Sequence, residues 1–175
     1  MNSANETRRL VLMRHAKAEP AGSVSDEMRP LALNGRRQAN AAGPLLVELG
    51  VTPDRVMVSG ALRTRQTWEL LSNGLDVEAS FAEITDALYL AHPQDVLSMI
   101  GELDGSCSTA LIVGHEPTMS GLAAHLGGPD SDLEAYNKVR FGLQTSAFAV
   151  LESTLPWSAW AEATARLTLS ARPQV

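Results

Sequence analysis

This chain of 175 residues has one cysteine, few aromatic residues and no long hydrophobic segment. The single cysteine, Cys107, excludes an intrachain disulfide and is typical of proteins in a reducing compartment. No segment approaches the roughly 20 apolar residues of a membrane-spanning helix. The polar N-terminus leads into only four apolar residues, Leu10 to Met13, which is too short for a signal-peptide core. We therefore expect a cytoplasmic protein without a membrane partner.

Positive charge is also scarce, because the formal net charge is −6. This balance argues against a general nucleic-acid or anionic-membrane binder. The basic residues are twelve arginines and only two lysines. Arginine presents a planar, permanently charged fork that suits carboxylate and phosphate groups. An acidic protein with this bias can gather arginines in one anion-binding pocket.

The composition is that of a globular domain, with 45% hydrophobic and 5% aromatic residues. The 24 alanines indicate a core built from Leu, Val and Ala with closely packed helices. The length suits one domain, which we place at residues 8–170, after a flexible tail at residues 1–7.

Short apolar runs alternate with helical segments along the chain. This pattern predicts an α/β fold with a mostly parallel central sheet and helices on both of its faces. Strands are expected at 10–13, 55–59, 109–113, 146–151 and within 160–170, with a weak candidate at 77–81. Helices are expected at 34–49, 61–72, 93–102 and 117–126, and loops at 18–30 and 129–138. Gly43-Pro44 is a point where the first helix can kink or divide.

Polar residues follow three of the predicted strands. The first strand leads to Arg14 and His15, the second to Arg63 by way of Ser59, and the third to His115. Sites in open α/β sheets form at the carboxyl ends of the strands, so these side chains can share a pocket. Each one alone also fits an ordinary loop histidine or a surface ion pair, so the argument depends on the set. Two arginines and two histidines suit a dianion, of which phosphate is the natural candidate.

An ordered series of short motifs resembles the histidine phosphatase superfamily, which includes phosphoglycerate mutases and acid phosphatases. The first motif is Leu12-Met13-Arg14-His15-Ala16-Lys17, in which Ala16 and Lys17 resemble the SixA-type phosphohistidine phosphatases. The others are Arg29-Pro30-Leu31, Gly35-Arg36-Arg37-Gln38-Ala39, Pro53-Asp54, Val58-Ser59, Ala61-Leu62-Arg63, Gln66-Thr67, Leu88-Tyr89, Val113-Gly114-His115-Glu116-Pro117 and Thr145-Ser146-Ala147. The resemblance covers residues 9–152 and implies a phosphoglycerate mutase-like three-layer sandwich.

The resemblance implies that His15 is the nucleophile of a phosphatase. Its neutral imidazole would attack phosphorus and form a phosphohistidine that water then hydrolyses. Arg14, Arg63 and His115 would hold the phosphoryl oxygens. Neither a metal nor another cofactor is expected, since the arginines supply the positive charge.

Three further residues are candidates for substrate binding. Arg29 can contact substrate at the pocket rim or form a structural ion pair. Ser59 can bind phosphate or cap the helix at 61–72, and we favour the cap. Lys17 can steer anions or remain a solvated charge. Glu116 is expected to cap the helix that follows it.

The substrate class depends on a general acid. Phosphomonoesters have a poor alkoxide leaving group and need a positioned proton donor, whereas a phosphoramidate can dispense with one. Asp86 is the better candidate donor and Glu83 the second. Our main interpretation is hydrolysis of phosphohistidine on a protein, or of a related phosphoramidate. The alternatives are a small-molecule phosphomonoesterase that uses Asp86 or Glu83, and a phosphate-binding module without catalysis; the sequence leaves the oligomeric state open.

Overall fold

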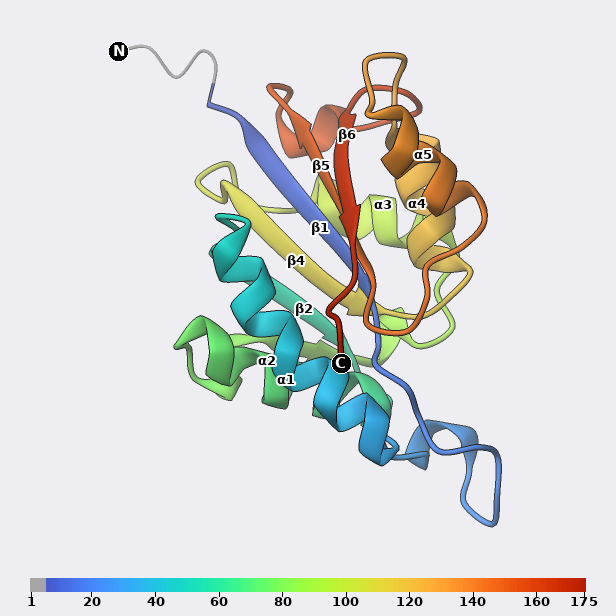
Figure 1. Ribbon diagram of the computed structural model, residues 1–175. Helices are drawn as coiled ribbons and strands as arrows, with labels where there is room; N and C mark the ends of the chain where they lie inside the picture. The colour runs from blue at the N-terminus through green and yellow to red at the C-terminus, as the bar shows by residue number, and fades with distance from the viewer. Residues whose placement is uncertain (1–5) are drawn as a thin grey trace.

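Six strands form one central sheet in the computed structural model, which describes residues 6–175 (Figure 1). They are β1 (Arg8–Arg14), β2 (Arg55–Ser59), β3 (Glu83–Thr85), β4 (Thr109–Gly114), β5 (Phe148–Ser153) and β6 (Arg166–Ala171). Their order in the sheet is β3-β2-β4-β1-β5-β6. The pairs β2–β3, β2–β4 and β1–β4 are parallel, and the pairs β1–β5 and β5–β6 are antiparallel. The predicted α/β fold with a mostly parallel sheet is confirmed.

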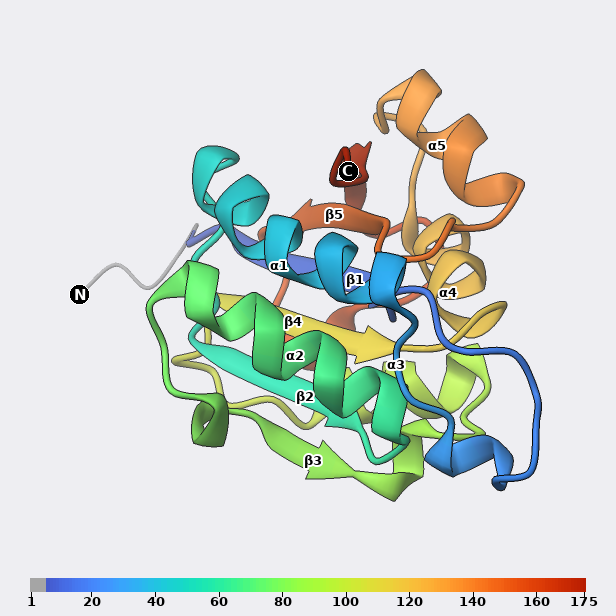
Figure 2. The same cartoon turned by 60° about the horizontal axis from the view of Figure 1, so that its bottom comes forward.

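Helices cover both faces of this sheet. The α-helices of the described residues are α1 (Leu33–Glu48), α2 (Leu62–Leu75), α3 (Pro93–Gly101), α4 (Thr118–Leu126) and α5 (Leu133–Arg140). Short 3₁₀ turns are η1 (Asp26–Met28), η2 (Ala79–Phe81), η3 (Asp86–Leu88) and η4 (Trp157–Ala159). Helices α1 and α2 lie side by side on one face, and α3 and α4 lie on the other (Figures 1 and 2). Within the described part of the chain, no helix has the length and apolar character to cross a bilayer.

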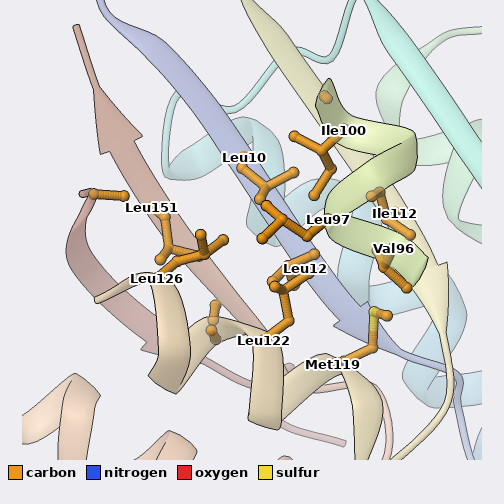
Figure 3. Packing of buried hydrophobic residues seen from close by; sticks show 14 of the residues in the cluster. Leu10, Leu12, Val96, Leu97, Ile100, Ile112, Met119, Leu122, Leu126 and Leu151 are labelled. Atoms are coloured by element: carbon orange, nitrogen blue, oxygen red, sulfur yellow. The ribbon is translucent and has the colours of Figure 1, made fainter. Parts of the chain in front are cut away.

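Strand β1 contributes to the core on both of its faces. Leu10 and Leu12 belong to the cluster under α3 and α4, and Val11 and Met13 to the cluster under α1 and α2. All four side chains are fully buried. Figure 3 shows Leu12 beside Leu122 of α4. A strand in the middle of a covered sheet needs apolar side chains at every position, which explains the continuous run in the sequence.

Helix α1 runs without a break through Gly43 and Pro44. The glycine allows α1 to approach α2 closely, because a Cβ atom at Gly43 would lie 2.4 Å from the carbonyl oxygen of Leu71. The helix pair buries Leu46 and Trp68 against the sheet. The pair thereby packs beside the carboxyl ends of β1 and β2.

Two of our local expectations were wrong. The stretch at 129–138, expected as a loop, contains most of α5, which begins where the Asp132 carboxylate accepts a hydrogen bond from the amide of Ala135. Polar residues dominated that stretch, while its two buried positions, Ala135 and Val139, made too weak a pattern to predict a helix. The weak strand expected at 77–81 holds η2, and the strand follows at β3. The predicted tail at 1–7 lies outside the described residues except for its last two positions.

Candidate active site

Arg14, His15, Arg63 and His115 line one cavity of about 430 Å³. This volume is in the range of small-molecule sites. The residues come from the end of β1, from the start of α2 and from the position after β4. The parallel strands β1, β4 and β2 end at the same edge of the sheet, so residues distant in sequence meet there. The walls also include Lys17, Asp26, Arg29, Tyr89, Glu116 and Thr145.

His15 is held as a neutral imidazole with one free nitrogen. Its Nδ1 lies 2.7 Å from the carbonyl oxygen of Ala16, so Nδ1–H donates there and leaves the Nε2 lone pair available. The pKa of His15 is lowered to about 3, chiefly by burial and also by His115 and the guanidinium groups of Arg63 and Arg14, while the hydrogen bond to the Ala16 carbonyl opposes this shift. At pH 7 this ring can act as a nucleophile.

Two helices hold the segment that carries His15. The amide of Ala16 donates to Thr67 Oγ1 of α2 at 3.0 Å, and the amide of Lys17 donates to Gln38 Oε1 of α1 at 3.0 Å. Gly35 lets α1 approach this segment, because a Cβ atom there would lie 1.9 Å from the Lys17 carbonyl oxygen. The position of His15 therefore depends on both helices as well as on β1.

His115 faces His15 across the cavity, with ring centroids 5.4 Å apart. Its Nε2 lies 2.7 Å from Ser59 Oγ, and its Nδ1 lies 3.5 Å from Nη2 of Arg63. Burial, followed by the charge of Arg63, lowers the pKa of His115 to about 4. This second histidine is therefore also neutral at pH 7.

The expected capping role of Ser59 is wrong. Helix α2 has Ala61 at its N-cap without a side-chain cap, and the Ser59 hydroxyl accepts only a long 3.4 Å bond from the Ala61 amide. Ser59 is fully buried and lies behind His115, outside the lining of the cavity. Its hydroxyl therefore forms a hydrogen bond with His115 and does not line the cavity.

Both arginines of the predicted set present donors in the cavity. Arg14 donates from Nη1 to the Leu143 carbonyl oxygen at 2.9 Å, which fixes its guanidinium. Arg63 donates from Nη1 to the Asp26 carbonyl oxygen at 2.8 Å, and its Nη2 lies 3.1 Å from the carboxylate of Asp26. The Nε atoms of both arginines are buried without a partner among the described residues. A bound oxyanion would supply acceptors to such a donor set.

Asp26 is the main feature of the cavity that the sequence did not indicate to us. Its carboxylate accepts hydrogen bonds from Tyr89 Oη, Arg29 Nε and Arg63 Nη2. The Tyr89 hydroxyl is the largest cause that lowers the pKa of Asp26 to about 2, with the two arginines adding to it. Arg29 both lines the cavity and holds this loop, since its Nη1 donates to the Glu19 carbonyl oxygen. The only signal in the sequence that could have indicated this pair is the three-residue spacing of Asp26 and Arg29.

Glu116, the other carboxylate of the cavity wall, has the capping role that we predicted. It accepts from the amide of Ser120 at 2.9 Å, which satisfies a donor in the first turn of α4. It also accepts from the Ser120 hydroxyl at 2.5 Å and from the amide of Leu143 at 3.1 Å. These bonds hold the chain that carries the Leu143 carbonyl next to Arg14.

The structure brings neither predicted general acid into the cavity. Glu83 lies at the amino end of β3, pairs with Arg55 and lines a separate cavity. Asp86 follows β3 and packs its Oδ1 over Gly60, where a Cβ atom would come within 1.9 Å of it. The parallel register of β2 and β3 places Glu83 beside Met57, away from the edge at which the strands end.

The remaining histidines and the cysteine lie outside the cavity lining. His92 is the N-cap of α3, and His125 lies in the last turn of α4. Burial is the main cause that raises the pKa of the Cys107 thiol to about 12, and Sγ donates to Asp54, so the thiol is not activated as a thiolate. Among residues 6–175, no group of three or more His, Cys, Asp and Glu side chains is placed to hold a metal ion.

Comparisons with known proteins show the family and the fold of the chain. A family model described as the histidine phosphatase superfamily (branch 1) matches residues 10–86. A Nakamurella multipartitia structure, provisionally named phosphohistidine phosphatase SixA, is 34% identical, with a TM-score of 0.83 over 99% of this chain and 100% of that one. The chain belongs to the histidine phosphatase superfamily. This confirms the predicted family, its phosphoglycerate mutase-like sandwich and the phosphatase class that the resemblance implied.

Two more relatives extend the agreement within this superfamily. The protein histidine phosphatase SixA, solved in complex with tungstate, is 26% identical, with a TM-score of 0.76 over 94% of this chain and 97% of that one. An uncharacterised protein of Mycobacterium tuberculosis is 38% identical over 149 residues, which are 83% of this chain and 90% of the relative. The similarity therefore extends over nearly the whole length of both relatives.

Proposed function

We propose that this protein hydrolyses the phosphoramidate bond of phosphohistidine, carried by a protein or by a related small molecule, through a phosphohistidine on His15. The observation that carries the proposal is the state of His15. Its Nδ1 is bound to the Ala16 carbonyl, and its Nε2 faces a cavity lined by Arg14 and Arg63. A neutral nucleophile beside two guanidinium groups suits attack on a phosphoryl dianion.

The reaction proceeds in two displacements at phosphorus. In the first, the Nε2 lone pair of His15 forms a bond to phosphorus while the bond to the substrate nitrogen breaks. The electron pair of that bond stays on the leaving nitrogen, which is protonated from solvent. In the second, water attacks phosphorus, the bond to Nε2 breaks, and phosphate leaves with one water proton lost to solvent. Arg14 and Arg63 stabilise the charge on the phosphoryl oxygens in both steps.

The carboxylates of the cavity support a nitrogen leaving group over an alkoxide. Both oxygens of Glu116 accept hydrogen bonds from Ser120, and Leu143 donates to one of them. The lowered pKa of Asp26 keeps it ionised at neutral pH. An ionised carboxylate cannot donate the proton that an alkoxide requires, whereas the nitrogen of phosphohistidine leaves without a dedicated acid.

A substrate panel tests this proposal against the phosphomonoesterase. Wild-type protein should hydrolyse phosphoimidazole and a phosphohistidine peptide, and should leave glycerol phosphate essentially unchanged. Asp86→Ala should retain the phosphoramidate activity, because Asp86 does not line the cavity. Rapid turnover of glycerol phosphate that is lost in Asp86→Ala would establish the monoesterase and overturn the proposal.

Trapping of the covalent intermediate tests it against a binding module without catalysis. Radiolabelled phosphoimidazole should transfer acid-labile phosphate to the wild-type chain, and His15→Ala should take up none. Labelled phosphate that stays on the chain at alkaline pH and is lost in acid is the signature of a phosphohistidine. Phosphate binding without label transfer or turnover would favour the binding module.

The group that the protein would recognise on its partner is a phosphorylated histidine. The cytoplasm is the compartment we propose for the reaction, on the basis of the single reduced cysteine. Identification of the phosphorylated protein requires a screen of phosphohistidine proteins as substrates.

A further inference from the structure

The buried hydroxyl of Ser59 has a single acceptor for its proton. Its oxygen already accepts a hydrogen bond from the Ala61 amide at 3.4 Å. Nε2 of His115, at 2.7 Å, is the only acceptor within hydrogen-bond distance of this hydroxyl in the described chain. Ser59 is fully buried, so no solvent exposure offers an alternative. A buried hydroxyl is stabilised by donating its proton, and here it can do so only to Nε2.

This bond determines which nitrogen of His115 carries the proton. A neutral imidazole has one N–H, so a ring that accepts at Nε2 must be protonated at Nδ1. Nδ1 is the nitrogen on the side of Arg63, at 3.5 Å from Nη2. Nη2 of Arg63 directs an N–H towards this nitrogen, and a guanidinium can only donate, so this contact by itself would favour a lone pair on Nδ1. Its 3.5 Å separation is long for a hydrogen bond from a charged donor, usually 2.7–2.9 Å, so we give the 2.7 Å contact with Ser59 the greater weight. With Nδ1 protonated, His115 and Arg63 each offer a donor at the wall of the same cavity, and such a pair suits one shared acceptor, such as an oxyanion.

We propose that Ser59 is a positioning residue that holds neutral His115 as its Nδ1–H tautomer, so that His115 and Arg63 donate together to one phosphoryl oxygen. Without the hydroxyl, the proton can move to Nε2 and leave a lone pair on Nδ1. A lone pair facing a phosphoryl oxygen would repel it. The shared donation to a phosphoryl oxygen rests on the proposed function. The tautomer of His115 does not, because it is a property of the protein without substrate.

The surroundings of His115 make the choice of tautomer matter. The charged and titratable groups that act on it come from four elements. They are Arg14 and His15 from the end of β1, Asp26 from η1, Tyr89 beside η3 and Arg63 from α2. The lowered pKa of His115 means that the ring cannot rely on a second proton near pH 7. Its capacity to donate at Nδ1 then depends on Ser59.

A ¹⁵N spectrum of the wild-type protein tests the inference without any substitution. Long-range ¹H–¹⁵N correlations at pH 7 distinguish the two neutral tautomers, and His115→Gln identifies the signals of this ring. We expect Nδ1 to carry the proton and Nε2 to show the shift of an unprotonated nitrogen. Protonation at Nε2, or an averaged mixture of both tautomers, would overturn the inference. This measurement is independent of turnover, so inactivity towards phosphoramidates would refute the proposed function without affecting it.

Variants of Ser59 test the consequence. Ser59→Ala should move the proton of His115 to Nε2, weaken inorganic phosphate binding and lower kcat/KM by about 10-fold or more. Ser59→Thr, which keeps the hydroxyl, should restore the Nδ1–H signal and part of the activity. Ser72→Ala is the matched control, because it removes another buried serine hydroxyl, one bound to the Glu69 carbonyl in α2. If Ser59→Ala leaves the tautomer and phosphate affinity unchanged, Ser59 does not position His115.

Discussion

Arg63 contacts three other residues of the cavity wall. It contacts the backbone and the carboxylate of Asp26, lies over the ring of Tyr89 and approaches Nδ1 of His115. Its side chain is 6% exposed, so its charge acts in a poorly screened environment. The guanidinium is thereby oriented before substrate arrives, which is the condition for effective stabilisation of transition-state charge.

Arg63→Ala should lower kcat/KM for a phosphoramidate by about 100- to 1000-fold, the usual cost of losing one such donor. Arg63→Lys should recover only part of this loss, because an ammonium lacks the planar fork. Arg65→Ala is the matched control, since Arg65 is exposed on the same helix. Steady-state kinetics on the three variants checks the prediction, and equal losses in Arg63→Ala and Arg65→Ala would contradict it.

Asp26 places a negative charge among the anion-binding donors. It occupies Arg63 and Arg29 in the structure, so a phosphoryl group must share these donors with it. Asp26→Asn should therefore tighten competitive inhibition by inorganic phosphate by about 3- to 10-fold, as expected for removal of one like charge a few ångströms away. Glu27→Gln removes the same charge from the adjacent exposed position, outside the cavity lining, and should leave the inhibition constant unchanged. Weaker inhibition in Asp26→Asn would show that its hold on Arg63 matters more than its charge.

At the level of elements, helices α1 and α2 position the chemistry while contributing only Arg63 to it. Thr67 accepts a hydrogen bond from the amide of Ala16, and Gln38 accepts one from the amide of Lys17. Gln66 accepts a hydrogen bond from the amide of Leu31. The loop between β1 and α1 is therefore attached at both of its ends to the helix pair. These hydrogen bonds give the sequence motifs around Gln38 and Thr67 a physical role, which is to hold the segment that follows His15.

Gly35→Ala should disturb this attachment, because the new Cβ would lie 1.9 Å from the carbonyl oxygen of Lys17. Backbone cannot yield as a flexible side chain can, so we expect a loss of about 1–3 kcal/mol in the free energy of unfolding, together with reduced activity. Gly105→Ala, with no atom within 4 Å of the added group, is the matched control. Urea denaturation and kinetics on both variants test this, and an active, fully stable Gly35→Ala would contradict the assigned role of the close contact.

For the whole molecule, the folded state keeps His15, the proposed nucleophile, neutral by burying it. His15 has a pKa of about 3 when folded, below the ordinary value of 6.5 that it regains on unfolding. Well above pH 6.5 His15 is unprotonated in both states, and its contribution to stability is fully present. As the pH falls from 6.5 towards 3, only the unfolded state gains the proton, so this contribution to stability is progressively lost.

The unfolding free energy of wild type should therefore fall more steeply with decreasing pH than that of His15→Ala. The difference should be about 1.4 kcal/mol per pH unit well between the two pKa values. Urea denaturation of both proteins at pH 4.5, 5.5, 6.5 and 7.5 measures it. Parallel pH profiles would mean that His15 titrates equally in both states. The same lowered pKa predicts that acid down to pH 5 does not inactivate the nucleophile by protonation.

Much of the architecture could be predicted because its signals are local. The buried strands are continuous apolar runs, and glycine and proline mark most of the breaks between elements. Helix α5 and strand β3 were missed because each has few buried residues, so neither makes a clear period. The four residues at the strand ends could be predicted to meet because parallel strands direct their carboxyl ends to one edge of a sheet.

The sequence by itself determined the family, the α/β layers and the set Arg14, His15, Arg63 and His115, since short motifs and local periodicity carry that information. Only the tertiary structure decided which other groups meet this set. Asp26 reaches Arg63 across 37 positions and Ser59 reaches His115 across 56, and no periodicity encodes such contacts. The protonation states of the two histidines likewise depend on burial and on these distant neighbours, so they exist only in the folded protein.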